Sequence, residues 1–193
     1  MEKLSRSLFI ADQLDTKSYD VFNWDMFLIS SIYRNEIKDI EAEKEIIRGY
    51  AKATNCLFEE IKRTNHPSSG ELILTVNSLV VPFVFLCRHT VELILKYLRN
   101  SLSIQPTNKH QLLALWNDVE NALIEKAPSD SSLKEFIENA KIYISVLEEL
   151  DPDGTRARYS KSTSGKPYHS KPKFIRVIAL NDVLQKMVLP LIE

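Results

Sequence analysis

The sequence predicts an all-α fold: an antiparallel helical bundle with a long polar loop before its last helix. Three observations lead to this prediction. Glycine occurs only four times in 193 residues, so few positions favour tight turns. Apolar residues recur at spacings of three and four rather than two, which is the period of an amphipathic helix. Residues that end helices are confined to a few short clusters.

Two helices are expected in the first third of the chain, after an N-terminal arm of residues 1–20. The first spans residues 21–34, where apolar side chains fall on one face. The second and clearer one spans about residues 40–65, with a stripe that repeats over its whole length. Pro67 and Gly70 then end this helix, because proline disfavours helical geometry at the residue before it.

A central, strongly apolar helix is expected after this break. Its most apolar run is residues 79–87. Pro82 either lies in the early turns of this helix or kinks a longer helix that begins near Glu71, and the sequence leaves both alternatives open. Because the apolar run is about half as long as a membrane span, no membrane contact is predicted.

Two further helices are expected in the second half. Residues 112–123 form one, after a loop that contains Pro106. Ser129 or Asp130 can cap the next, since both side chains can accept from the first free backbone N–H groups. The turn Asp-Pro-Asp-Gly at 151–154 ends that helix.

The C-terminal part combines a basic loop with a last helix. Residues 151–174 form the loop, and its polar part from 155 to 173 is either a long loop or a pair of short strands. The last helix is predicted to be capped near Asn181. Because the length suits one hydrophobic core and no linker is evident, residues 1–193 are predicted to be a single domain.

The composition limits the kinds of partner and site. With 25 basic and 26 acidic residues the chain is almost neutral, so nucleic-acid binding requires a local patch. Cys56 and Cys87 both stand in apolar, helical surroundings and are predicted to be buried thiols of a cytoplasmic protein. The four histidines lack the paired spacing of zinc sites, so neither a metal nor another cofactor is predicted.

Five ionisable residues fall on one arc of about 100° on the central helix. They are Arg88, His89, Glu92, Lys96 and Arg99. Glu92 stands four residues from both Arg88 and Lys96, the spacing of a helical ion pair. Two explanations stay open: an ion pair that fixes how the helices meet, or a cleft where Arg88 holds a phosphate and His89 transfers protons.

Two other segments can complete such a cleft. His110 opens the helix after the loop, either as a capping or surface residue or as part of a site. From Arg156 to Arg176 the chain is basic, has no acidic residue and includes aromatic residues such as Tyr159. Positive charge with aromatic side chains suits a phosphate backbone and stacked bases, although a solvated loop can have the same composition.

In this order, the three segments resemble motifs of the HEPN superfamily of small all-helical domains. The first motif, of the form RHxxELxLK, matches Arg88, His89, Glu92, Leu93, Leu95 and Lys96. The second, HxLxxLW, matches His110, Leu112, Leu115 and Trp116. The third, an Asp-Pro-Asp turn that leads to Arg-Tyr, matches Asp151, Pro152, Asp153, Arg158 and Tyr159. The likeness covers roughly residues 79–159.

The resemblance implies a helical bundle that often dimerises, with polar residues facing a shared cleft. Many relatives are ribonucleases of toxin–antitoxin, phage-defence or RNA-processing systems, and others are binding modules without activity. It implies three sets of residues in this chain. The catalytic candidates are Arg88, His89 and His110. The candidates for contacts with RNA or phosphate are Lys96, Arg156, Arg158 and Tyr159. The supporting network is Glu92, Asp151 and Asp153.

One feature of the nuclease pattern is missing. Catalytic members place an arginine four to six residues ahead of a histidine on a late helix, and no histidine of this chain has an arginine at that spacing. The expectation is a cytoplasmic protein that binds RNA or a nucleotide phosphate. If it cleaves RNA, the expected scheme is metal-independent transesterification. The alternative is a non-catalytic interaction module that binds a cognate antitoxin or defence partner. A homodimer is expected in either case.

Overall fold

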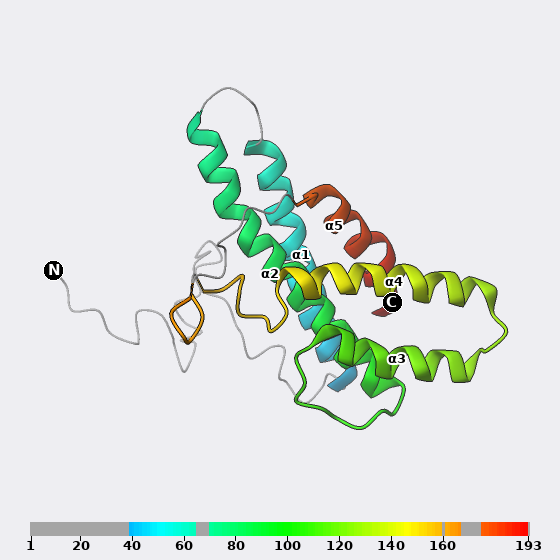
Figure 1. Cartoon of the computed structure of the whole chain (residues 1–193). Helices are drawn as coiled ribbons and strands as arrows, with labels where there is room; N and C mark the ends of the chain where they lie inside the picture. Colours follow the sequence, from blue (N-terminus) through cyan, green and yellow to red (C-terminus); the bar gives the residue numbers. More distant parts are fainter. Residues whose placement is uncertain (1–38, 65–69, 160, 167–174, 193) are drawn as a thin grey trace, which may run out of the picture.

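The computed structural model describes residues 39–64, 70–159, 161–166 and 175–192, and these form a bundle of α-helices (Figure 1). The predicted all-α fold is thereby confirmed. The predicted arm at 1–20 and the predicted helix at 21–34 lie outside the described residues.

Helices α1 (Asp39–Thr64) and α2 (Gly70–Ser101) form an antiparallel hairpin and run side by side (Figure 1). Contacts between the two helices fix this direction. The Tyr50 ring meets His89 with ring centroids 4.6 Å apart, and the Phe58 ring lies 6.2 Å from that of Phe83. Residue numbers therefore rise along one helix as they fall along the other.

Helix α2 is the central element of the bundle. It begins at Gly70 with Pro82 inside it, which decides between the two alternatives in favour of the longer helix. Its segment Ser78–Ser101 is long and apolar enough to cross a membrane by length and composition alone. Half of the most apolar part of that segment is buried inside the structure. The absence of membrane contact stays a prediction.

Helices α3 (Leu112–Lys126) and α4 (Ser131–Leu150) form a second antiparallel hairpin. The predicted cap of α4 is confirmed at Asp130, whose side chain accepts from the backbone N–H groups of Ser132 and Leu133. The first turn of α3 is capped from outside, because a Glu148 carboxylate oxygen on α4 accepts from the Leu112 N–H at 2.7 Å. The C-terminus of α4 is thereby tied to the N-terminus of α3.

The last helix begins earlier than predicted. Helix α5 (Val177–Val183) continues into a π-helical turn, η4 (Leu184–Val188), and a 3-10 turn, η5 (Leu189–Ile192). The predicted cap at Asn181 is wrong. This residue is buried inside the helix, where its Nδ2 donates to the Asn55 side-chain oxygen of α1 at 3.2 Å.

Two further sequence expectations are resolved in part. In the described part of 155–173 the chain forms turns, closed by a hydrogen bond from the Ser162 N–H to the Lys166 carbonyl at 2.9 Å, and no extended strand pair is seen there. Cys87 is fully buried as predicted, and burial raises the pKa of its thiol to about 12. The prediction for Cys56 is wrong, because this side chain is exposed on the outer face of α1.

Candidate functional site

The structure divides the predicted charged arc of α2 into an inner and an outer part. Arg88, Glu92 and Arg99 are buried, whereas His89 and Lys96 are partly exposed. Arg99 belongs to a separate contact: its guanidinium pairs with Asp118 of α3 and also donates to a backbone carbonyl at 2.6 Å. The arc is therefore two groups of residues, and the first is centred on Arg88.

Arg88 is enclosed by hydrogen-bond acceptors, and its side chain is only 2% exposed. Its Nε donates to the Asp151 carbonyl at 2.7 Å and one terminal nitrogen donates to the His110 carbonyl at 2.6 Å. The other terminal nitrogen pairs with Glu92 at 2.8 Å. One guanidinium therefore joins α2, the start of α3 and the end of α4. We call Arg88, Glu92 and the backbone of His110 and Asp151 the brace.

Glu92 is the anionic centre of the brace. One carboxylate oxygen binds Arg88, and the other accepts from Lys96 and contacts the His110 Nδ1, both at 2.8 Å. Burial alone would raise the pKa of Glu92, but the hydrogen bonds from Lys96, His110 and Arg88 outweigh it and hold the pKa at about 2. Glu92 is therefore ionised throughout the physiological pH range.

This depressed pKa predicts how stability depends on pH. A carboxyl group whose pKa falls from 4.5 to about 2 on folding contributes stability above pH 4.5, and this contribution is lost as the pH falls toward 2. Its size is on the order of 3 kcal/mol. We expect the melting temperature to fall more between pH 5 and pH 2 in the wild type than in Glu92→Gln, as measured by circular dichroism. Parallel curves for the two proteins would contradict this assignment.

The turn at 151–154, which follows α4, packs against the Arg88 guanidinium. Asp151 is fully buried and ends α4, and one of its carboxylate oxygens accepts from the Arg156 N–H at 2.8 Å. Gly154 has a φ of +71°, and a Cβ atom at this position would lie 3.0 Å from an Arg88 terminal nitrogen. The backbone of Gly154 thus packs against the guanidinium, which would have to shift by a few tenths of an ångström to admit a Cβ atom. Sequence reasoning placed Gly154 in a turn but did not recognise this contact.

His89 lies beside the brace but is not part of it. Its ring stacks on Phe85 with centroids 5.6 Å apart and meets the edge of Tyr50. Burial lowers the pKa of His89 and the nearby cations add to this effect, against the opposing influence of Glu92, so the ring is neutral at pH 7. Phe85 was detectable from its spacing of four residues, but nothing in the sequence indicated Tyr50 of α1.

The Arg-Tyr motif lies next to this histidine. The Arg158 guanidinium stands 5.6 Å from both the Phe85 ring and the Tyr159 ring, and its Nε donates to the Gly154 carbonyl at 2.6 Å. Because this acceptor is neutral, the charge of Arg158 is not cancelled there. Tyr159 is 58% exposed. The basic loop and the central helix therefore lie in contact at this point, through Phe85, which stands just before the predicted motif.

The remaining predicted residues occupy supporting positions. His110 has a side chain 63% exposed, with its ring on Glu92 and its carbonyl on Arg88. Asp153 does not join the brace: its carboxylate accepts from the backbone N–H and hydroxyl of Thr155, which lower its pKa. Arg156 is half-buried, with its backbone bound to Asp151.

Comparisons with known proteins do not extend these observations. No protein-family model matches this chain, and no curated protein or solved structure matches it. The resemblance to the HEPN superfamily therefore depends on the three motifs and stays a prediction. Within the described residues, no group of three or more histidine, cysteine, aspartate or glutamate side chains is placed to hold a metal ion.

Proposed function

We propose that this protein is a HEPN-like helical protein that binds RNA or a nucleotide phosphate on the outer face of α2. The surface consists of Phe85, His89 and Lys96 of α2, flanked by His110, Arg158 and Tyr159, and we call it the α2 strip. The observation that supports this function best is the contact of Arg158 with both Phe85 and Tyr159. It places a cation that has no ion pair among the described residues beside two aromatic rings.

The chemistry of the strip suits single-stranded nucleic acid. Exposed aromatic rings such as Tyr159 stack on bases, and an arginine beside them attracts the phosphate backbone. Lys96 extends the polar surface by about three helical turns from Phe85, or about 16 Å, and His110 lies beside it on Glu92. The negative charge of Glu92, however, cancels part of the positive charge of Lys96. Most of the affinity is therefore expected at the end near Arg158.

The proposal is binding rather than cleavage. The scheme with an arginine that stabilises a phosphorane requires a guanidinium able to reach phosphate, and all three nitrogens of Arg88 already donate to buried acceptors. The neutral ring of His89 is partly exposed and could accept a proton, but no arginine stands at the spacing of the nuclease motif. Arg88 is thus a structural residue beneath the α2 strip and is not available to bind phosphate.

Binding of a labelled single-stranded RNA, measured by fluorescence anisotropy in EDTA, tests this function. Tyr159→Ala is expected to weaken binding roughly tenfold, the effect of one lost stacking contact. Arg158→Ala is expected to reduce the slope of log affinity against log salt by about 0.7, the value for one phosphate contact. Lys134→Ala, an exposed cation of α4 outside the strip, is the matched control. No binding by the wild type, or an equal loss in Lys134→Ala and in the variants of the strip, would refute the proposal.

A second candidate is a non-catalytic module that binds a protein, such as a cognate antitoxin or defence partner. The observation that favours it is the closed brace, because an ion pair sealed from water fixes how the helices meet. In this case His89→Ala or Glu92→Ala lowers the melting temperature, and the wild type itself neither binds nor alters RNA. The anisotropy measurement above, made on the wild type, therefore distinguishes the two candidates.

A further inference from the structure

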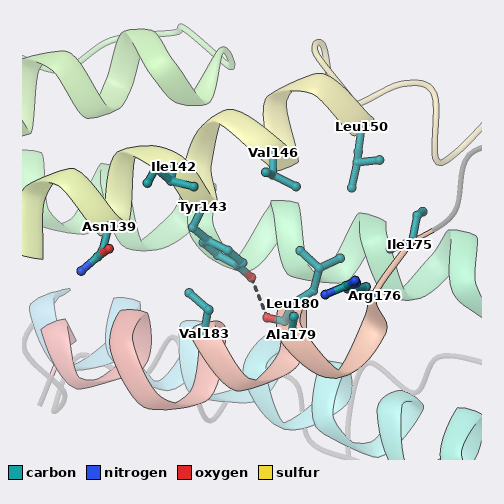
Figure 2. A pocket seen from close by; sticks show the side chains of 10 residues that line it. All are labelled: Asn139, Ile142, Tyr143, Val146, Leu150, Ile175, Arg176, Ala179, Leu180 and Val183. Atoms are coloured by element: carbon teal, nitrogen blue, oxygen red, sulfur yellow. Dashed lines mark hydrogen bonds between the residues drawn. The ribbon is translucent and has the colours of Figure 1, made fainter.

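A groove lies between α4 and α5 (Figure 2), and none of the residues that line it belongs to the α2 strip. It encloses about 440 Å³. One wall carries Ile142, Val146 and Leu150, each four residues from the next, and the other carries Ile175, Ala179 and Val183 at the same spacing. Two rows of small and branched apolar side chains therefore face each other across an open channel.

The groove is held open by its floor. The Tyr143 hydroxyl of α4 donates to the Leu180 carbonyl of α5 at 3.0 Å, which joins the two walls at the bottom (Figure 2). Tyr143 and Leu180 are both buried, whereas Ile142 and Val146 of the α4 wall are 65% and 41% exposed. Single exposed apolar residues are common, but a row of them along a preformed groove marks an interaction surface.

The charge of the groove indicates what it binds. Among the residues that line it, Arg176 is the only one charged at neutral pH, and it lies at one end beside Ile175 (Figure 2). Arg176 is exposed and forms no ion pair with another described residue. An apolar channel with an exposed cation at its end complements an apolar stripe that is followed by a carboxylate.

We propose that this groove docks an amphipathic α-helix of a partner protein, with apolar residues at i, i+4 and i+7 and a carboxylate that pairs with Arg176. The wall from Ile142 to Leu150 extends about 12 Å, which matches slightly more than two turns of a helix. A helix fits because its apolar stripe packs between two parallel rows at i+4 spacing. Because only about two helical turns would contact the groove, we expect the helix to bind with micromolar rather than nanomolar affinity.

The proposal is tested on the full chain with a synthetic peptide. The probe is a fluorescein-labelled helix of about 15 residues, long enough to form helical turns, with leucines at i, i+4 and i+7 and glutamates at one end. Ile142→Asp is expected to weaken binding at least tenfold, because it places a charge against the leucines. The matched control is Ile124→Asp, the same substitution at an exposed isoleucine of α3 outside the groove. It should leave binding within about twofold.

A charge reversal tests the role of Arg176. Arg176→Glu is expected to weaken the acidic peptide about threefold to tenfold and to strengthen a matching peptide with lysines at the same end. Arg158→Ala, the variant that tests RNA binding, should leave peptide binding unchanged, so the two proposals fail separately. Unchanged binding in Ile142→Asp, or equal losses in Ile124→Asp, would overturn the docking proposal.

Two further measurements test whether something other than a partner helix occupies the groove. Sedimentation velocity over a range of concentrations shows whether the chain forms a dimer. A dimer that is lost in Ile142→Asp would assign the groove to a second copy and overturn the proposal. A synthetic peptide of residues 20–36 that binds the wild type but not Ile142→Asp would assign it to a segment of this chain, with the same consequence.

Discussion

Arg88→Ala is expected to lower the free energy of unfolding by about 3–5 kcal/mol, the cost of leaving a buried charge without its partner. The substitution removes three hydrogen bonds that join three segments of the bundle. It also leaves Glu92 almost inaccessible to water and without its closest buried cation. Urea denaturation followed by circular dichroism measures the loss. A decrease below about 1 kcal/mol would show that the brace is not needed for the fold.

Two further variants separate burial from charge. Arg48→Ala removes an exposed ion pair with Glu45, three residues away on the same helix, and is expected to cost less than about 1 kcal/mol. The double variant Arg88→Met and Glu92→Met removes both charges together. We expect it to be more stable than Arg88→Ala, because no buried charge is left unpaired. Equal losses for exposed and buried pairs would contradict this explanation.

The sequence was sufficient for the helices that have one buried face. Helix α1 was predicted within one residue of its bounds, and the capping side chain of α4 was identified, because both depend on local spacing. Asn181 shows where local reasoning fails. Asparagine is a good helix cap, but this one is buried because Asn55 of α1, 126 residues away, offers it a hydrogen bond. Such a contact has no local signal.

The candidate site divides in the same way. The ion pair of Arg88 with Glu92 was predictable, because both residues are on one helix four positions apart. The two carbonyl groups that complete the coordination of Arg88 were not, since backbone oxygens leave no trace in a sequence. Whether the arc was a cleft or a buried pair therefore depended on tertiary packing, and for Arg88 the packing gives a buried pair.

The role of Gly154 gives the sharpest test of that packing. Gly154→Ala is expected to destabilise the fold by about 2–4 kcal/mol. Part of this, about 1 kcal/mol, is the cost of a side chain at positive φ. The rest follows because the new Cβ atom would lie 3.0 Å from a terminal nitrogen and 3.2 Å from the Cζ of Arg88. The guanidinium must then shift by a few tenths of an ångström, which strains its hydrogen bonds to buried acceptors. Thermal and urea unfolding measure the loss.

Gly165 provides a matched control for this change, because it shares the backbone geometry and lacks the neighbour. Its φ is +79°, and an added Cβ atom there would meet nothing within 4 Å. Gly165→Ala should therefore cost only about 1 kcal/mol, the backbone contribution alone. The difference between the two variants measures what the contact with Arg88 contributes. It should vanish in the background of Arg88→Ala, since the guanidinium is then absent, and a difference that persists there would place the strain elsewhere in the turn.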